Sequence, residues 1–242
     1  MARPGMTVQV GARPEPLTID PAEAAVIVVD MLNDFAAPEG MFARAGIPIA
    51  AIRATVEPTS RVLAAARRAG MLVLYQKMEF ASDLSNAGGP DAPNLTKHLP
   101  LGIGDRVQAP DGREGRILVE GTWNTEILSE LTPHPGDLIL SKHRYSGFYE
   151  TPLDKVLRDA GIGTLVFTGC TTSVCVESTL RDAFYRDYRC LLLSDCTAEP
   201  IGGDTERSNH EASLLVVETL FGWVAESTAL VQPLAELASV RA

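Results

Sequence analysis

The stretch LVFTGCTTSVCVESTLRDAF, residues 165–184, decides the fold class of this chain. Its first part is an apolar run typical of a buried β-strand, and the run breaks at Gly169. Apolar residues then recur at helical spacing, with Cys175 in the first turn of the expected helix. A strand that leads directly into a helix is the unit from which parallel sheets are built. The stretch therefore predicts an α/β protein.

The same alternation of strand and helix patterns continues on both sides of this stretch. It predicts a three-layer α/β/α fold with a mainly parallel sheet, in one domain over residues 1–242 with residues 1–20 as an N-terminal extension. Residues 77–122 are rich in Gly, Pro and Asp, and are expected to be a long excursion of this domain rather than a linker. Strands are predicted at residues 24–30, 71–76, 137–142, 164–169 and 189–195, and helices at residues 49–68, 124–131, 153–159, 174–186 and 206–221.

Composition excludes several classes of function. The 242 residues are 45% hydrophobic and 21% charged, which is enough apolar material for a large buried core. The formal net charge of −10, without any basic cluster, argues against binding to nucleic acid or to an anionic membrane. No apolar run has the length of a signal peptide core or of a membrane span. We therefore expect a cytoplasmic protein that acts on a small molecule.

The cysteines and histidines do not form a metal-binding or disulfide pattern. In a reducing cytoplasm the cysteines are expected to be thiols. No CxxC pair is present and the histidines lack ligand spacing, so neither a zinc site nor a redox pair of Cys170 with Cys175 is expected. The residues concerned are Cys170, Cys175, Cys190 and Cys196, with His98, His134, His143 and His210.

Three reactive side chains lie at the predicted carboxyl ends of strands. Asp30 ends the first strand, Lys142 ends the third, and Cys175 begins the helix after the fourth. Each has an ordinary structural explanation, since such an Asp is often a cap, such a Lys a solvated charge, and such a Cys a small core residue. Ligands of open parallel sheets bind beyond the carboxyl ends of the strands, however, and there all three can meet.

Together these residue types are those of a cysteine nucleophile with its activating groups. A thiol attacks a carbonyl carbon as the thiolate, which a helix N-terminus and a nearby ammonium both favour. Asp30 is suited to take the thiol proton and return it to the departing nitrogen, while Lys142 keeps the carboxyl ionised. The turn between Gly169 and Cys175 offers backbone N–H groups where the oxyanion of the intermediate develops.

Three motifs carry a resemblance to a known family over nearly the whole chain. They are VIVVDMLNDF (26–35), KHRYSGFYETPLD (142–154) and GCTTSVCVESTLRDAF (169–184). The chain resembles the isochorismatase-like cysteine hydrolases, which include nicotinamidases and the N-carbamoylsarcosine, biuret and ureidoacrylate amidohydrolases. Within this superfamily it is most similar to the ureidoacrylate amidohydrolases of pyrimidine utilisation, through RPEPLTIDP (13–21), AGGPDAPN (87–94) and ETLFGWV (218–224).

The resemblance implies the isochorismatase-like fold and specific site residues. It makes Asp30, Lys142 and Cys175 the catalytic triad, implies a cis peptide bond between Cys170 and Thr171, and places the oxyanion hole at the backbone amides of Thr171 and Cys175. The nicotinamidase branch binds a metal through histidines after the second strand. Residues 77–85 contain no histidine, so no metal and no other cofactor are expected.

Residues around the triad are expected to bind the substrate. Relatives usually have Asp or Asn at the position of Ser173, and YQKMEFASDLS (75–85) differs from the corresponding segment of ureidoacrylate amidohydrolases. Glu79 and Asp83 in this segment raise the alternative of a cationic substrate. The candidate substrate-binding residues are Asn33, Phe35, Gln76, Trp123 and Tyr145.

The expected activity is that of a cysteine amidohydrolase that cleaves a C–N bond through a thioester intermediate. Its substrate is a small ureide, carbamoyl or amide compound, with ureidoacrylate first and biuret, an N-carbamoyl amino acid, a lactam or a cationic amide as alternatives. Cys175 disfavours hydrolysis of a vinyl ether, and the intact triad disfavours an idle binding module. Phe221 and Trp223 in LFGWVAES (220–227) are difficult to bury in one core, so a homo-oligomer is expected.

Overall fold

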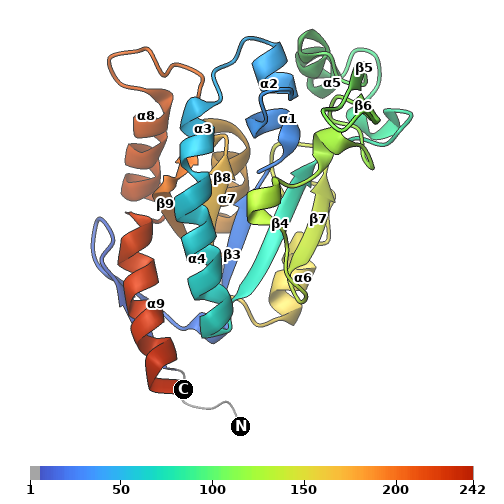
Figure 1. The fold of residues 1–242 in the computed structure, drawn as a ribbon. Coiled ribbons are helices and arrows are strands. Elements are labelled where there is room, and N and C mark those ends of the chain that lie inside the picture. The colour runs from blue at the N-terminus through green and yellow to red at the C-terminus, as the bar shows by residue number, and fades with distance from the viewer. Residues whose placement is uncertain (1–5, 242) are drawn as a thin grey trace.

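The computed structural model describes residues 6–241. The centre of the molecule is a six-stranded sheet in the order β10-β9-β8-β3-β4-β7, in which all neighbouring strands are parallel (Figure 1). The predicted mainly parallel sheet is thus confirmed. The strands are β3 (Ala24–Val29), β4 (Leu72–Met78), β7 (Leu138–Lys142), β8 (Thr164–Cys170), β9 (Arg189–Ala198) and β10 (Trp223–Ala225).

Both faces of the sheet are covered by helices because its central strands are apolar on both sides. Along β3, Val26 and Val28 point into one apolar cluster, and Ile27 and Val29 point into the other. The first cluster lies under α4 and α9, and the second lies under α6 and α7 (Figure 1). These helices are α4 (Val56–Ala69), α6 (Leu153–Asp159), α7 (Glu177–Phe184) and α9 (Ser227–Arg241).

The order of the strands creates a crevice at the centre of the sheet. From β3 the chain adds β4 and then β7 on one side, and afterwards adds β8, β9 and β10 on the other side. The direction of winding therefore reverses next to β3, and such a switch point is where open α/β sheets bind ligands. Asp30 follows β3, and Cys175 follows β8 in the turn before α7.

The predicted helix over residues 124–131 is wrong. The structure has two 3₁₀ turns there, Trp123–Thr125 and Ser129–Leu131, joined by an extended segment. In that segment Ile127 pairs with Leu32, and the Leu128 amide donates to the carbonyl of Met31. The apolar residues of this segment thus reach the core from an extended chain. In so short a segment, the spacing of apolar residues does not distinguish such a chain from a helix.

The C-terminal region contains two elements that the sequence patterns did not predict. Strand β10 adds to the sheet edge beside β9, and α9 packs against α4. The predicted helix 206–221 is shorter, because Ser208 caps α8 (Asn209–Val216) and a π-turn, Val217–Phe221, follows. Phe221 is buried, whereas Trp223 is only half-buried, so the core of one chain takes up the first side chain but not all of the second.

The described part of the N-terminal extension, residues 6–20, contains a β-hairpin. Strands β1 (Val8–Val10) and β2 (Leu17–Ile19) pair antiparallel, and β1 packs against α9. At the tip of the hairpin, Arg13 pairs with Val224 of β10 through the backbone and with Glu218 through its side chain at 2.8 Å. The hairpin therefore ties the edge of the sheet to the C-terminal helix.

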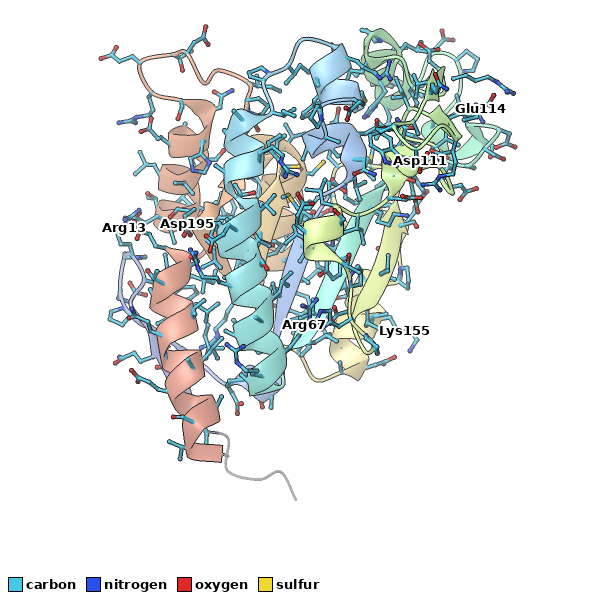
Figure 2. The ribbon with its side chains drawn as sticks, viewed as in Figure 1. Arg13, Arg67, Asp111, Glu114, Lys155 and Asp195 are labelled. Atoms are coloured by element: carbon cyan, nitrogen blue, oxygen red, sulfur yellow. The ribbon has the colours of Figure 1, made fainter. Side chains whose placement is uncertain are left out.

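The excursion after β4 lies beside the end of the sheet where the strands terminate (Figure 1). It carries a small hairpin with the exposed ion pairs Arg106–Glu114 and Arg113–Asp111, of which Figure 2 labels Glu114 and Asp111. No helix in residues 6–241 is long and apolar enough to cross a membrane. The remaining elements of this end are α1 (Asn33–Ala36), α2 (Met41–Arg44), α3 (Ala50–Ala54), α5 (Pro93–His98), β5 (Arg106–Gln108) and β6 (Glu114–Arg116).

Candidate active site

Asp30 is fixed at the centre of the sheet by backbone and side-chain contacts. It is the residue that follows β3, has a φ of 52°, and is fully buried. Its amide donates to the carbonyl of Gln76, and its Oδ1 accepts from the Met78 amide at 2.7 Å. Its Oδ2 accepts from Nζ of Lys142 at 2.7 Å. Both carboxylate oxygens are therefore held in place by β4 and β7.

Lys142 is a buried ammonium held by two acceptors. Its side chain is 1% exposed, and Nζ donates to Asp30 and to the carbonyl oxygen of Arg144 at 3.3 Å. Burial alone would lower the pKa of Lys142, but the interactions with Asp30 and Cys175 together more than offset it, so the pKa lies above its ordinary value. Lys142 is therefore protonated.

Cys175 contacts this ion pair from the neighbouring strand unit. It lies in the π-turn Thr172–Val176 before α7 and is 6% exposed, and its thiol contacts both Lys142 and Asp30. Burial raises the pKa of Cys175 well above its usual range, Lys142 opposes this effect, and Asp30 adds to it. The resting group is therefore a neutral thiol, which agrees with the expectation that Asp30 takes its proton. A base must remove its proton during the reaction.

The turn that carries Cys175 is anchored from its far side. The Cys170–Thr171 peptide bond is cis, as the resemblance implied. Ser173 donates from its amide and its hydroxyl to Oε2 of Glu199, at 2.9 and 2.6 Å. A carboxylate of the loop after β9 thus holds the turn in place through Ser173. Glu199 was not among the residues that the sequence patterns selected, because its partner lies 26 residues away.

A cavity of about 200 Å³ opens beside the Cys175 thiol. Four predicted site residues line it, namely Phe35, Tyr145 and the two residues of the proposed oxyanion hole, Thr171 and Cys175. Its other walls are mostly apolar and come from segments that periodicity alone did not mark as a site. They are Met41, Phe42, Ile47, Met78, His98, Leu101, Val174 and Ile201.

The other three substrate-binding candidates do not line this cavity. Asn33 donates from Nδ2 to the carbonyl of Trp123 at 2.8 Å, and so links α1 to the 3₁₀ turn that follows the excursion. Gln76 is 2% exposed and lies beneath Gly147, where a Cβ would clash with its amide. Asn33 and Gln76 therefore lie around the site and do not form part of the cavity wall.

His98 is a cavity residue that the sequence analysis did not connect with the site. Its Nδ1 lies 2.6 Å from the carbonyl oxygen of Asn94, which can only accept, so Nδ1 carries the proton. Burial lowers the pKa of His98, which keeps the ring neutral near pH 7. The ring packs between Phe80 and Tyr145. It therefore contributes an uncharged wall.

Asp34 connects the segments that surround the cavity. It is fully buried and accepts hydrogen bonds from the amides of Met41 and Leu118 and from Nδ2 of Asn124, at 2.6–3.0 Å. Burial raises the pKa of this carboxyl to about 6, although the three hydrogen bonds oppose the rise. The Asp34 carboxyl group thus links α1 and α2, which form part of the apolar cavity wall, to the end of the excursion.

The raised pKa of Asp34 predicts a pH dependence of stability. The folded protein binds the Asp34 proton more tightly than the unfolded chain, so this contribution is complete below about pH 4 and is lost as the pH rises to about 6, in all about 3 kcal/mol. Urea unfolding between pH 4 and 7 measures it. Asp34→Asn should remove this contribution, so that its stability falls less with rising pH than that of the wild type, whereas the exposed control Asp204→Asn should follow the wild type. Identical slopes in wild type and Asp34→Asn would contradict the assignment.

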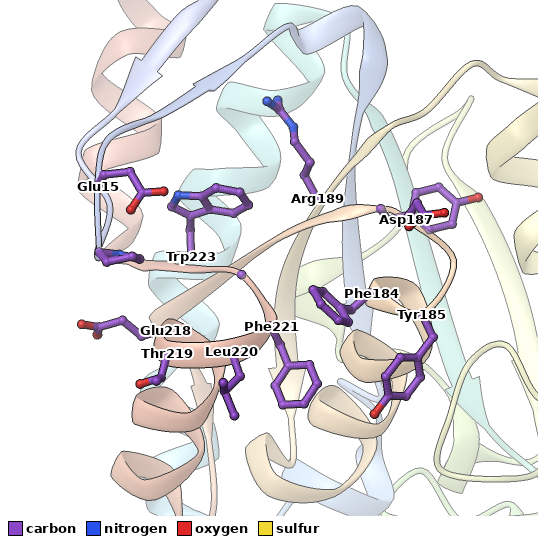
Figure 3. Close-up of a pocket in the computed structure, with 13 residues that line it drawn as sticks. Glu15, Phe184, Tyr185, Asp187, Arg189, Glu218, Thr219, Leu220, Phe221 and Trp223 are labelled. Carbon is purple, nitrogen blue, oxygen red and sulfur yellow. The ribbon is translucent and has the colours of Figure 1, made fainter.

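A second, more open hollow of about 550 Å³ lies at the amino ends of β9 and β10, the opposite end of these strands from Cys175 (Figure 3). Phe184, Tyr185 and Phe221 contact one another along one side of it, and Leu220 lies close by. It contains no cysteine or lysine, so it lacks the nucleophile found in the first cavity. Its aromatic character indicates a surface for contacts rather than for chemistry.

No group of three or more His, Cys, Asp or Glu side chains that could hold a metal ion occurs in residues 6–241. A thiol in the wall of a cavity, with a carboxylate and an ammonium beside it, can perform nucleophilic attack on a carbonyl group.

Comparison with known proteins gives matches along most of the chain. The family model described as the isochorismatase domain matches residues 24–229. A ureidoacrylate amidohydrolase of Methylobacterium radiotolerans is 42% identical over 218 residues, which cover 90% of this chain and 82% of that protein.

Solved structures agree with this result. A cysteine hydrolase from Pseudomonas syringae pv. phaseolicola is 29% identical with a TM-score of 0.75, and the match covers 98% of this chain and 100% of that one. An N-carbamoylsarcosine amidase from Thermoplasma acidophilum is also 29% identical, with a TM-score of 0.63, over 85% of this chain and 96% of that one.

Proposed function

The chain belongs to the isochorismatase family, and from this premise we propose that it is a cysteine amidohydrolase with Cys175 as its nucleophile. Its substrate is a small amide or ureide, in which it hydrolyses a C–N bond. The observation that carries the proposal is the contact of the buried Cys175 thiol with the Asp30–Lys142 ion pair beside a cavity. A buried ion pair is costly for a protein, which favours a chemical role for this one.

The first half of the reaction forms a covalent intermediate. Asp30 takes the thiol proton while Sγ of Cys175 bonds to the carbonyl carbon, whose double-bond electrons move to the oxygen. The amides of Thr171 and Cys175 donate to this oxyanion, and one such donor is typically worth roughly 3 kcal/mol. The C–N bond then breaks, and Asp30 returns the proton to the departing nitrogen. The product is a thioester, or a carbamoyl thioester for a ureide.

The second half of the reaction hydrolyses this intermediate. Water attacks the thioester carbonyl and loses a proton to Asp30, the C–S bond breaks, and the Cys175 sulfur recovers a proton. Lys142 remains protonated throughout and lowers the energy of both the thiolate and the oxyanion. The neutral resting thiol fits this sequence, because the proton leaves only when a carbonyl group is in position.

The names of the relatives guide the choice of substrates. One is a ureidoacrylate amidohydrolase and another is an N-carbamoylsarcosine amidase. We propose that this chain also acts on a small ureide or amide, and ureidoacrylate is the reference compound. A binding module without catalysis is disfavoured by the complete Asp-Lys-Cys cluster. Hydrolysis of a vinyl ether is disfavoured by the thiol.

A substrate screen tests the proposed function. Purified enzyme is assayed for ammonia or carbamate release from ureidoacrylate, biuret, N-carbamoyl amino acids, lactams and simple neutral amides, beside the Cys175→Ala variant. We expect turnover of at least one compound by the wild type and none by the variant. Equal release by both proteins, or alkylation of Cys175 by iodoacetamide with no loss of turnover, would contradict a cysteine mechanism.

We also propose that the protein is a homo-oligomer that contacts its copies through the aromatic hollow of Figure 3. Phe184, Tyr185 and Leu220 are 41%, 66% and 64% exposed there, which is unusual for a cluster of large apolar side chains. Light scattering at micromolar concentration should give a dimer or larger mass, and Leu220→Glu should shift it toward the monomer. A monomeric wild type would refute the proposal.

A further inference from the structure

The wall of the cavity beside Cys175 is dominated by hydrocarbon and thioether side chains. Eight of its twelve lining residues are Phe, Met, Ile, Leu or Val. They come from several separate segments, including α1, α2, the end of β4 and the loop after β9, so the apolar character does not arise from one helix face. An apolar wall around a reacting carbonyl favours a substrate group that gains by leaving water.

No cation is available in this wall to pair with an anionic substrate. None of the lining residues, all in the described part of the chain, is Lys or Arg. Lys142 already pairs with Asp30, and one guanidinium nitrogen of Arg144 donates to the backbone carbonyls of Asn86 and His143. His98 uses its Nδ1 proton on a backbone carbonyl 2.6 Å away, and burial lowers its pKa. An anion in the cavity would thus lose water without forming an ion pair with any of the described lining residues.

No carboxylate lines this wall to pair with a cationic substrate either. Glu79 is buried against Lys77 at 2.8 Å and also accepts from Ser141, so it does not line the cavity. Glu199 lies behind the nucleophile turn, where it bonds to Ser173. The Glu199 carboxylate would also repel an anionic substrate group bound at this turn.

We infer that the substrate group held in this cavity is uncharged and apolar, so that the enzyme takes small neutral amides or ureides with a hydrocarbon substituent in preference to anionic ureides such as ureidoacrylate. This inference rests on the proposed function and narrows it. An unpaired carboxylate is expensive to remove from water, whereas a hydrocarbon group of the same size is favoured in an apolar cavity. Ureidoacrylate, the compound in the name of the 42% identical relative, carries a carboxylate, and no Lys or Arg lines this cavity to bind it.

A matched pair of substrates tests the inference directly. 3-Ureidoacrylate and its methyl ester contain the same scissile C–N bond and differ in one negative charge. We expect kcat/KM for ammonia and carbamate release to be at least about tenfold higher for the methyl ester. An equal or higher value for the acid would overturn the inference and leave the amidohydrolase function standing.

A binding measurement separates this inference from the proposed function. The Cys175→Ala variant is titrated with both compounds by calorimetry, which requires no turnover. Tighter binding of the ester supports the inference even if neither compound is hydrolysed, a result that would count against the proposed function alone. Equal binding, tighter binding of the acid, or no binding of either compound overturns it.

A charge placed at the cavity mouth provides the converse test. Ile201 lines the cavity and is 55% exposed, so a longer side chain can be accepted there without disturbing the core. Ile201→Arg is expected to shift the acid-to-ester ratio of kcat/KM toward the acid by about tenfold. Ile201→Gln adds length and polarity without charge and should shift the ratio by less than about twofold. An unchanged ratio in Ile201→Arg, or equal shifts in both variants, would contradict the inference.

Discussion

Cys175→Ala is expected to lower kcat/KM by at least about 10⁴-fold, because it removes the atom that bonds to the substrate carbonyl. The fold should survive, since the side chain is small and its turn is held by the Ser173–Glu199 hydrogen bonds. Steady-state assays on a hydrolysed compound measure the loss, and thermal unfolding measures the integrity of the fold. The matched control is Cys190→Ala, which removes an equally buried thiol far from the cavity.

The outcome of the control decides how the loss is interpreted. Burial raises the pKa of Cys190 to about 12, and this thiol contacts backbone carbonyls of α7 and the loop after it, so it has no role in the proposed chemistry. Its variant should keep kcat/KM within a few-fold. If Cys175→Ala retained more than a few per cent of wild-type activity, Cys175 would not be the nucleophile.

Asp30→Asn is expected to lower kcat by at least about 10³-fold, because an amide accepts no proton from the thiol. The same substitution should speed alkylation of Cys175 by iodoacetamide. The Asp30 carboxylate raises the pKa of the thiol, and its removal leaves Lys142 to favour the thiolate. Asp204→Asn, an exposed change, serves as the control and should alter neither rate.

Lys142→Ala should move alkylation in the opposite direction. The ammonium lowers the pKa of Cys175, so its loss raises the pKa further and slows labelling at a given pH. In all three proteins the labelling rate should increase with pH through pH 9, because the wild-type thiol is protonated at neutral pH. Unchanged labelling in both Asp30→Asn and Lys142→Ala would show that neither group controls the thiol.

The arrangement of the sheet was accessible from sequence because its signals are local. The run at 24–30 and the strand–helix stretch at 165–184 have the apolar character that parallel strands require, and both form central strands. Strand ends in such a sheet meet at one edge, which is why Asp30, Lys142 and Cys175 could be grouped before any contact was known.

The elements that were not predicted depend on partners distant in the chain. Strand β10 is three residues long, and its place beside β9 is fixed by pairing with Leu191–Leu193 and with Arg13 of the N-terminal hairpin. Helix α9 carries Pro233 in its interior, which interrupts the local helix signal. Its packing on α4 and β1 compensates for that local preference.

The cavity wall shows the same limit. His98, Leu101 and Ile201 belong to loops or short helices without a repeating pattern, and only the folded chain brings them to Cys175. The raised pKa of Cys175 is likewise not readable from sequence, because it follows from burial of the thiol and from the nearby Asp30 carboxylate. Sequence patterns indicate which groups can react, whereas burial determines their protonation.

A covalent intermediate on Cys175 can be trapped by rapid acid quench and identified by peptide mass spectrometry. Enzyme mixed with a saturating compound from the substrate screen is quenched within the first turnover and digested. We expect the acyl or carbamoyl group of that compound on the peptide containing Cys175, formed as the amine product is released, and absent from Cys175→Ala. An adduct on a different residue, or a complete first turnover without any adduct, would contradict the covalent mechanism.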